Sequence, residues 1–152
     1  MSNARVGIIL GSASDKDTLA PCEETLAKLG IPSESLVASA HRNPERVAEW
    51  ARTARDRGLQ VLIAIAGLRA ALPGVVAAHS TLPVIGVPVQ AGALSGVDAL
   101  LSMVQMPRGI PVATVAIGRG GAVNAALLAA AILGVSDDAI AAKLVSYREE
   151  WS

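Results

Sequence analysis

The chain has 152 residues, of which 52% are hydrophobic and 17% are charged, and its formal net charge at pH 7 is zero. We expect one domain over residues 1–152, since this length is sufficient for a sizeable core. The sequence has no basic block and only two tryptophans and one tyrosine, which argues against nucleic-acid binding. No apolar run approaches the roughly 18 residues of a membrane span, so no membrane partner is expected.

The cysteine content and the start of the chain bear on location. A single cysteine, Cys22, excludes an internal disulfide and is typical of a reducing cytoplasm. The first expected strand begins so close to Met1 that no signal peptide fits before it. We therefore expect a cytoplasmic protein. The high apolar content with little charge further predicts that surface is buried between subunits of a homo-oligomer.

Short apolar runs alternate with helical patterns along the whole chain. The first run ends at Gly11, and the helix after it stops at Gly30. The run at 60–66 is apolar without alternation, as expected of a strand that is covered on both faces. The expected strands are 6–10, 33–38, 60–66, 84–87 and 112–117, and the expected helices are 16–29, 44–57, 75–80, 95–105, 124–133 and 138–151. This order predicts an α/β fold with a parallel sheet, flavodoxin-like or Rossmann-like.

The segment Gly11-Ser12-Ala13-Ser14-Asp15 joins the first expected strand to the first expected helix. Its hydroxyl groups and the N–H groups of the helix start form a natural cradle for an anion. Ordinary capping by Ser12, Ser14 or Asp15 explains the same residues equally well. The segment is not a P-loop, because the Gly-Lys-Ser/Thr ending is absent.

The segment Ser39-Ala40-His41-Arg42-Asn43-Pro44 follows the second expected strand. Imidazole is the side chain most easily poised to carry a proton near neutral pH, and Arg42 is a permanent cation suited to phosphate or carboxylate. Pro44 can open a helix, which leaves His41 and Arg42 in a loop at the carboxyl end of a strand, where open parallel sheets bind ligands. A loop histidine bonded to the backbone is the alternative, and the neighbouring Ser39 and Arg42 favour function.

Other candidate features carry less weight. His79 falls late in a helix among small residues, and we interpret it as structural. Gly118-Arg119-Gly120-Gly121 is interpreted as a tight turn that contacts an anion, since it follows the wrong strand for a dinucleotide site. The stretch 105–109 fits either a surface loop or a lid. Cys22 has no histidine near it in sequence, which argues against a nucleophile, and two separated histidines without an acidic cluster predict no metal site.

Taken together, these segments resemble the PurE family of 5-(carboxyamino)imidazole ribonucleotide mutases. The matching segments are 11–15, 39–44, 82–90, 94–98, 104–114 and 124–130. The resemblance covers nearly the whole chain in order. It implies a three-layer α/β/α sandwich in a homo-octamer, without metal or organic cofactor, acting on a small-molecule ribonucleotide. The family's substrate contacts are expected at Ser12, Ser14, Asp15, Ser39, Arg42, Gly67 and Leu72, and its catalytic proton shuttle at His41.

The family's reaction moves a carboxylate from the exocyclic nitrogen to C4 of the imidazole ring. Protonation of the nitrogen carbamate releases carbon dioxide beside aminoimidazole ribonucleotide. Attack by C4 on the carbon dioxide then requires that the C4 proton leave. One imidazole, that of His41, can deliver the first proton and collect the second.

One segment departs from the family pattern. The mutases read Ala-Gly-Ala-Gly-Gly-Ala-Ala-His-Leu-Pro-Gly where this chain has 64–74, in which Ile65, Leu68, Arg69 and Ala71 replace two glycines, an alanine and the loop histidine. A related branch, which carboxylates aminoimidazole ribonucleotide directly with carbon dioxide, also lacks that histidine. Arg69 can bind a carboxylate or point to solvent. The mutase is favoured because most of the matching segments are of the mutase type. The direct carboxylase, which the loop supports, and a non-catalytic or re-purposed nucleotide-binding paralogue are the alternatives.

Overall fold

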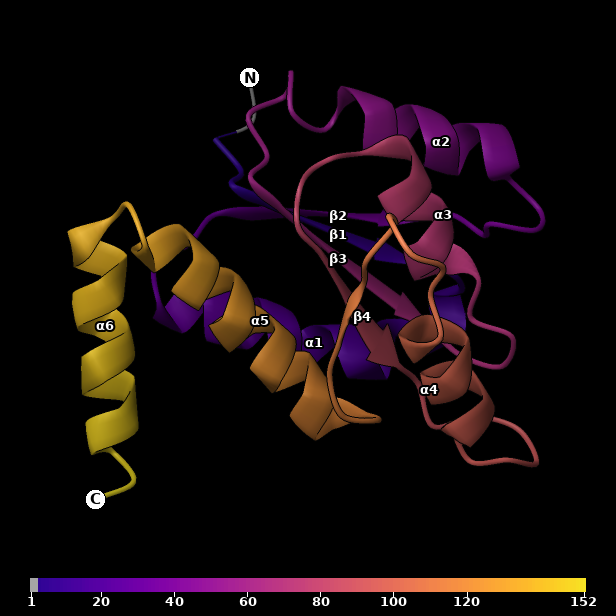
Figure 1. Ribbon diagram of the computed structural model, residues 1–152. Helices are drawn as coiled ribbons and strands as arrows, with labels where there is room; N and C mark the ends of the chain where they lie inside the picture. The colour runs from indigo at the N-terminus through magenta and orange to yellow at the C-terminus, as the bar shows by residue number, and fades with distance from the viewer. Residues whose placement is uncertain (1–2) are drawn as a thin grey trace.

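The computed structural model describes residues 3–152 and contains one five-stranded sheet (Figure 1). The strands lie in the order β2-β1-β3-β4-β5, and every neighbouring pair is parallel. The strands are β1 (Val6–Leu10), β2 (Ser33–Val37), β3 (Val61–Ala66), β4 (Val84–Pro88) and β5 (Ala113–Thr114). The predicted α/β class with a flavodoxin-like parallel sheet is confirmed.

Helices cover both faces of the sheet. The helices are α1 (Lys16–Lys28), α2 (Pro44–Thr53), α3 (Leu72–His79), α4 (Val97–Val104), α5 (Arg119–Gly134) and α6 (Asp138–Glu149), and a short 3₁₀ helix, η1 (Ala13–Asp15), precedes α1. One apolar core joins the sheet to α1, α5 and α6, and a second joins it to α2, α3 and α4. Figure 1 shows these two groups of helices on opposite sides of the strands.

The central strands supply both cores because successive side chains of a strand point to opposite faces. In β1, Ile8 packs toward α1 and α5, whereas Ile9 packs toward α2. Ile63 and Leu62 of β3 divide in the same way. Every residue of β1, β3 and β4 is buried. This burial explains why these strands read as continuous apolar runs in the sequence.

Some element boundaries differ from those predicted. Helix α2 ends at Thr53 and not at 57, and α3 begins at Leu72, with Pro73 in its first turn. The last strand forms only over Ala113–Thr114, whereas the sequence predicted 112–117. Strand β5 lies at the edge of the sheet and pairs with β4 alone. Beyond β5 the chain still contacts β4 through single hydrogen bonds, such as the one from Val115 N–H to Gly86 O at 3.1 Å.

The glycine-rich segment at 118–121 corrects a further interpretation. It is the first turn of α5, which begins at Arg119 and not at 124. Gly118 has a φ of 82°, a left-handed conformation that favours glycine. The Arg119 guanidinium donates to the carbonyl oxygen of Asp17 at 2.6 Å, which ties the start of α5 to α1. The segment is therefore a helix start, and its arginine contacts a backbone carbonyl.

Between residues 3 and 152, the structure has no helix that is both long and apolar enough to cross a membrane.

Candidate active site

A pocket of about 370 Å³ opens at the carboxyl ends of the strands. The loops after β1, β2 and β3 supply most of its wall, and Ala91 contributes from beyond β4. The structure brings every residue predicted for the site to this one pocket. They are Ser12, Ser14, Asp15, Ser39, His41, Arg42, Gly67 and Leu72. Segments that lie far apart in the sequence meet here because the strands are parallel, so their carboxyl ends share one edge.

The first wall is the segment after β1. The Ser12 hydroxyl caps η1 by accepting from the backbone N–H of Ser14 at 3.3 Å, and the Ser14 hydroxyl donates to it at 2.9 Å. Both serines are exposed toward the pocket opening. The hydroxyl groups of Ser12 and Ser14 therefore take part in capping and are also exposed, so each can form a further hydrogen bond with a ligand.

Asp15 differs from the serines because it is buried, with 7% of its surface exposed. It occupies the N-cap position of α1 but makes no side-chain capping bond. Burial raises the pKa of its carboxyl group above the ordinary value, and a backbone hydrogen bond from Ser12 opposes this rise. A buried carboxyl group of this kind is well suited to hydrogen bonds with the hydroxyl groups of a bound sugar.

The second wall is the loop after β2, and its own hydrogen bonds hold its shape. Ser39 accepts from the backbone N–H of Arg42 at 3.2 Å through its hydroxyl, and its own N–H donates to the Asn43 side chain at 3.3 Å. Ser39 therefore shapes the loop as well as lining the pocket. Asn43 was missed by the sequence analysis, although its position just before Pro44 is typical of a helix start.

This loop presents His41 and Arg42 to solvent at the mouth of the pocket. Within residues 3–152, neither side chain forms a hydrogen bond or an ion pair. The alternative of a histidine bonded to the backbone is thus not what the structure shows. An unpaired imidazole and an unpaired guanidinium, side by side in sequence, can together hold an anion and move a proton.

The third wall is the loop after β3, where the sequence departs from the PurE pattern. Leu68 and Ala70 have φ values of 54° and 43°, in the left-handed region that glycine adopts most easily. At Leu68 the backbone thus has a conformation that glycine favours, although the residue carries a bulky side chain. Arg69 lies between these two residues, exposed and lining the same pocket as His41. Strained loop backbone of this kind is often found at ligand sites.

Other candidate residues lie outside this pocket. Cys22 is buried, and burial raises the pKa of its thiol to about 12, which leaves it protonated and unreactive at neutral pH. The described part of the chain holds no cluster of three potential metal ligands. His79 ends α3, and the 105–109 loop enters β5 from its amino end. Within one chain that loop does not cover the pocket. Ala91 gave no signal in the sequence because it has no polar side chain.

Comparisons with known proteins bear on the family and the fold of the chain. The family described as AIRC, AIR carboxylase, matches residues 5–152. An N5-carboxyaminoimidazole ribonucleotide mutase of Bacillus subtilis is 57% identical over 95% of this chain and 89% of that relative. The bifunctional purine synthesis protein purC/E of Dictyostelium discoideum is also 57% identical over 95% of this chain, which spans only 14% of that longer protein. The crystal structure of Treponema denticola PurE superposes with a TM-score of 0.85 at 33% identity, covering 95% of this chain and 89% of that one.

Proposed function

The chain belongs to the AIR carboxylase family, and we propose that it converts 5-(carboxyamino)imidazole ribonucleotide into 4-carboxy-5-aminoimidazole ribonucleotide in purine biosynthesis. It is thus a mutase, an isomerase that moves a carboxylate within one substrate. The observation that carries this conclusion is the high identity, over most of the chain, to several relatives named for that activity. The pocket that gathers the predicted site residues agrees with it.

We propose that His41 carries the proton in both halves of the reaction. As imidazolium it protonates the carbamate nitrogen, the nitrogen–carbon bond breaks, and carbon dioxide is released. Carbon C4 of the ring then forms a bond to the carbon dioxide, and the C4 proton passes to the imidazole as aromaticity is restored. The imidazole thus gives up one proton and takes up one, so no net proton is exchanged. The His41 side chain is exposed and forms no hydrogen bond within residues 3–152.

The neighbouring residues would hold the ribonucleotide. Arg42 is an exposed guanidinium that can grip the phosphate through two parallel N–H donors. Ser12 and Ser14 offer hydroxyl groups at the same wall, and the buried Asp15 can bind the ribose hydroxyl groups. These contacts would keep the imidazole ring beside His41 through both steps, and holding reactants in place is itself a large part of catalysis.

Direct carboxylation of aminoimidazole ribonucleotide is the second candidate, and the loop after β3 favours it. Ala71 stands where the mutases carry a histidine, and Arg69 adds a cation to the pocket. An assay of the purified protein with each ribonucleotide, with and without bicarbonate, separates the two reactions. Turnover of the carboxyamino substrate without bicarbonate supports the mutase. Turnover only of aminoimidazole ribonucleotide with bicarbonate supports the carboxylase, and inactivity in both supports a nucleotide-binding paralogue.

The position of Arg69 leads to a prediction about substrate binding. The substrate carries two anionic groups, a phosphate and a carboxylate, and the pocket holds two arginines, Arg42 and Arg69. We expect Arg69→Ala to lower kcat/KM for the carboxyamino substrate about tenfold, since a hydrogen bond to a charged group contributes roughly 1.5–3 kcal/mol. Affinity for aminoimidazole ribonucleotide, which has no carboxylate, should stay unchanged in calorimetry.

A matched control for this variant is Arg46→Ala, which removes an exposed arginine of α2 away from the pocket. A triple variant, Leu68→Gly, Arg69→Ala and Ala71→His, restores the loop of the family. We expect its turnover of the carboxyamino substrate to fall as well, because the variant also lacks the Arg69 guanidinium. Higher mutase turnover in that triple variant would mean that the pocket needs an open, glycine-rich wall. Unchanged rates in both variants would show that the loop takes no part in the chemistry.

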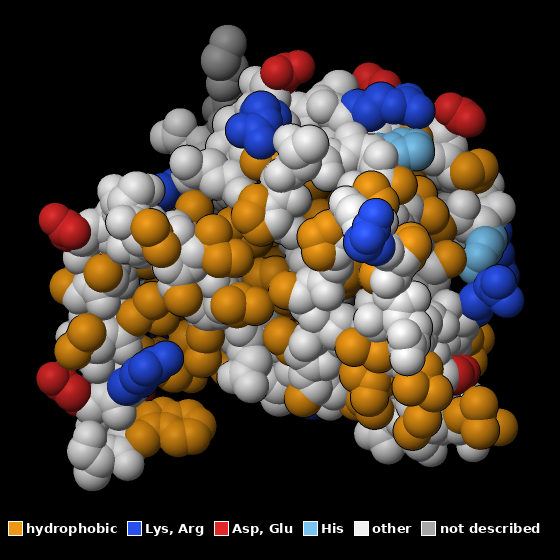
Figure 2. All heavy atoms as spheres, in the orientation of Figure 1, with side chains coloured by type: hydrophobic (Ala, Val, Ile, Leu, Met, Phe, Trp, Pro, Cys, Tyr) orange, Lys and Arg blue, Asp and Glu red, His pale blue; other side chains and the backbone are white. Residues whose placement is uncertain are grey.

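We also propose that the chain assembles as a homo-octamer, the assembly that the family resemblance implies, and that it acts in the cytoplasm, which its single cysteine favours. Support comes from large apolar side chains exposed on and beside α4, of which Leu94, Val97, Leu101 and Val104 are about half exposed or more. Figure 2 shows hydrophobic surface gathered over this part of the molecule. A patch of this kind on a monomer is unusual and marks an interaction site.

Light scattering at micromolar concentration should therefore give a mass of about eight times the 15.4 kDa of one chain. Leu101→Glu should reduce that mass, because it places a charge in the exposed apolar surface of α4. A monodisperse monomer of the unmodified protein would contradict the proposal and leave the apolar surface of α4 unexplained.

A further inference from the structure

Asn43 occupies the N-cap position of α2, but its side chain does not cap the helix. An asparagine at this position usually accepts from a backbone N–H two or three residues further along the chain. Asn43 forms no such bond. Its Oδ1 atom instead accepts from the backbone N–H of Ser39 at 3.3 Å. The side chain thus stabilises the loop in front of the helix and not the first turn of the helix.

Other helix starts show what this contact replaces. The Asp137 carboxylate caps α6 in the usual way, by accepting from the N–H of Ile140 at 3.2 Å. Asp15, at the start of α1, resembles Asn43 in forming no capping bond. Within residues 3–152, Asp15 and Asn43 are the polar N-cap residues whose side chains leave their helices uncapped. Both lie in segments that wall the candidate active site, where proteins commonly give up stability for function.

Three hydrogen bonds close the loop between Ser39 and Asn43. Besides the side-chain bond, the N–H of Asn43 donates to the Ser39 carbonyl oxygen at 2.8 Å, and the N–H of Arg42 donates to the Ser39 hydroxyl at 3.2 Å. His41 lies inside this loop, and its side chain forms no hydrogen bond of its own within residues 3–152. The backbone of the loop is therefore what holds the imidazole in place.

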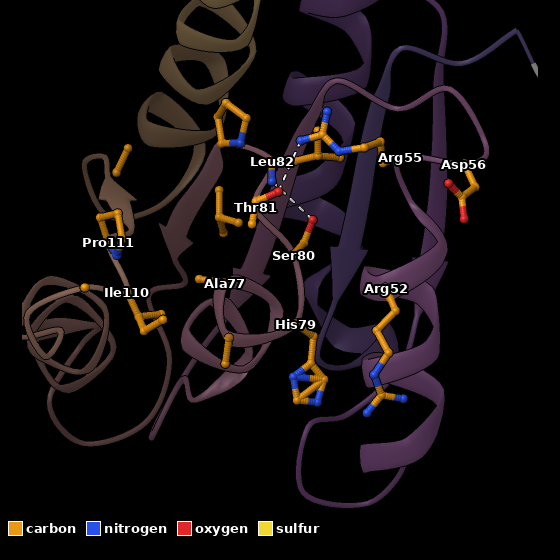
Figure 3. Close-up of a pocket in the computed structure, with 15 residues that line it drawn as sticks. Arg52, Arg55, Asp56, Ala77, His79, Ser80, Thr81, Leu82, Ile110 and Pro111 are labelled. Atoms are coloured by element: carbon orange, nitrogen blue, oxygen red, sulfur yellow. Dashed lines mark hydrogen bonds between the residues drawn. The ribbon is translucent and has the colours of Figure 1, made fainter.

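The body of α2 is held by contacts that do not involve Asn43. Just beyond its far end, beside a cavity of about 830 Å³, Figure 3 shows Arg55 directed at Thr81, whose hydroxyl accepts from the guanidinium at 3.2 Å. Trp50 is buried in the core, and its indole N–H donates to Glu34 of β2 at 3.2 Å. Loss of the Asn43 side chain should therefore leave the helix in place and loosen the loop in front of it.

We propose that Asn43 is a positioning residue for His41, an inference that rests on the proposed mutase function. Its side-chain oxygen, through the N–H of Ser39, holds the loop in the shape that keeps the imidazole beside the reacting ring. Proton transfer needs donor and acceptor within about 2.6–3.2 Å, so a small shift of His41 lowers the rate. Arg42 reaches the phosphate through a long, flexible side chain that can follow such a shift. The side chain of Asn43 therefore acts on kcat more than on KM.

Steady-state kinetics of Asn43 variants test this role. Asn43→Ala should lower kcat for the carboxyamino substrate by about threefold to tenfold, the effect of one hydrogen bond, and leave KM within about threefold. Asn43→Asp keeps an oxygen that can accept from the Ser39 N–H, so it should keep kcat within about twofold. Each protein is measured at its own pH optimum, because aspartate adds a charge. In the His41→Asn protein, Asn43→Ala should cause no further loss.

Asp137→Ala is the matched control, because it removes an N-cap side chain that does cap its helix and does not line the pocket. It should lower the midpoint of thermal unfolding by about 2–4 °C and keep kcat at a temperature well below that midpoint. Three results overturn the proposal. They are full activity of Asn43→Ala, an equal loss of kcat in Asn43→Asp, and a further loss on adding Asn43→Ala to His41→Asn.

Hydrogen exchange followed by mass spectrometry separates this inference from the proposed function. Residues 38–44 should exchange faster in Asn43→Ala than in the unmodified protein or in Asn43→Asp, because the loop opens more often. Inactivity of the unmodified protein toward both ribonucleotides would overturn the proposed function. Equal exchange in the three proteins would instead show that Asn43 does not hold the loop, whether or not the protein is active.

Discussion

Replacement of His41 by asparagine is expected to lower turnover by about 10²–10⁴-fold, the usual contribution of a general acid–base group. Asparagine keeps a polar side chain of similar reach but cannot take up or release a proton near neutral pH. Ribonucleotide affinity should stay within about tenfold, since Arg42 and the serines of the first wall remain in place.

Steady-state rates and equilibrium titration of the same preparation separate the two effects. A matched control is Glu45→Gln, which changes an exposed residue in the first turn of α2, close to His41 in the chain. The control should keep both rate and affinity. Turnover of the His41→Asn protein close to that of the unmodified enzyme would remove His41 from the mechanism, whereas a loss confined to affinity would make it a binding residue only.

Replacement of Gly121 by alanine is expected to destabilise the fold by at least about 3 kcal/mol, at the upper end of overpacking effects. A Cβ atom built on Gly121 would lie 1.6 Å from the carbonyl oxygen of Ala116, so the start of α5 would have to move. This start is buried against the core that α5 shares with α1. The shift would therefore disturb packing well beyond the substituted residue.

Gly120 provides a matched control for that prediction, because it lies one residue earlier in the same helix and a Cβ there meets no atom within 4 Å. Gly120→Ala should leave stability unchanged or raise it by up to about 1 kcal/mol, since alanine favours helix. Thermal unfolding of the three proteins side by side makes the comparison. Equal midpoints for Gly120→Ala and Gly121→Ala would show that the chain at Ala116 relaxes freely.

Much of the fold could be predicted from the sequence because the relevant forces act locally. The apolar runs of β1 and β3 and the helix starts predicted at 44 and 138 coincide with observed elements. The Asp137 carboxylate accepts from the N–H of Ile140 at 3.2 Å, as expected of a capping residue. The predicted boundaries were wrong at the end of α2, at the start of α3, at the edge strand β5 and at the start of α5. At β5 and α5, pairing with β4 and contact with α1 decide the boundary.

The candidate site, like the fold, was predictable in part from the sequence and in part only from the tertiary structure. The sequence by itself identified the candidate residues, because the proton-carrying capacity of imidazole in His41 and the permanent charge of Arg42 belong to the side chains and need no fold. The tertiary structure decided that these residues share one pocket with Asp15, since only the parallel order of the strands brings their carboxyl ends to one edge. It also decided that Arg69 lines that pocket. Such groupings depend on contacts between distant segments, and no pattern within a single segment encodes them.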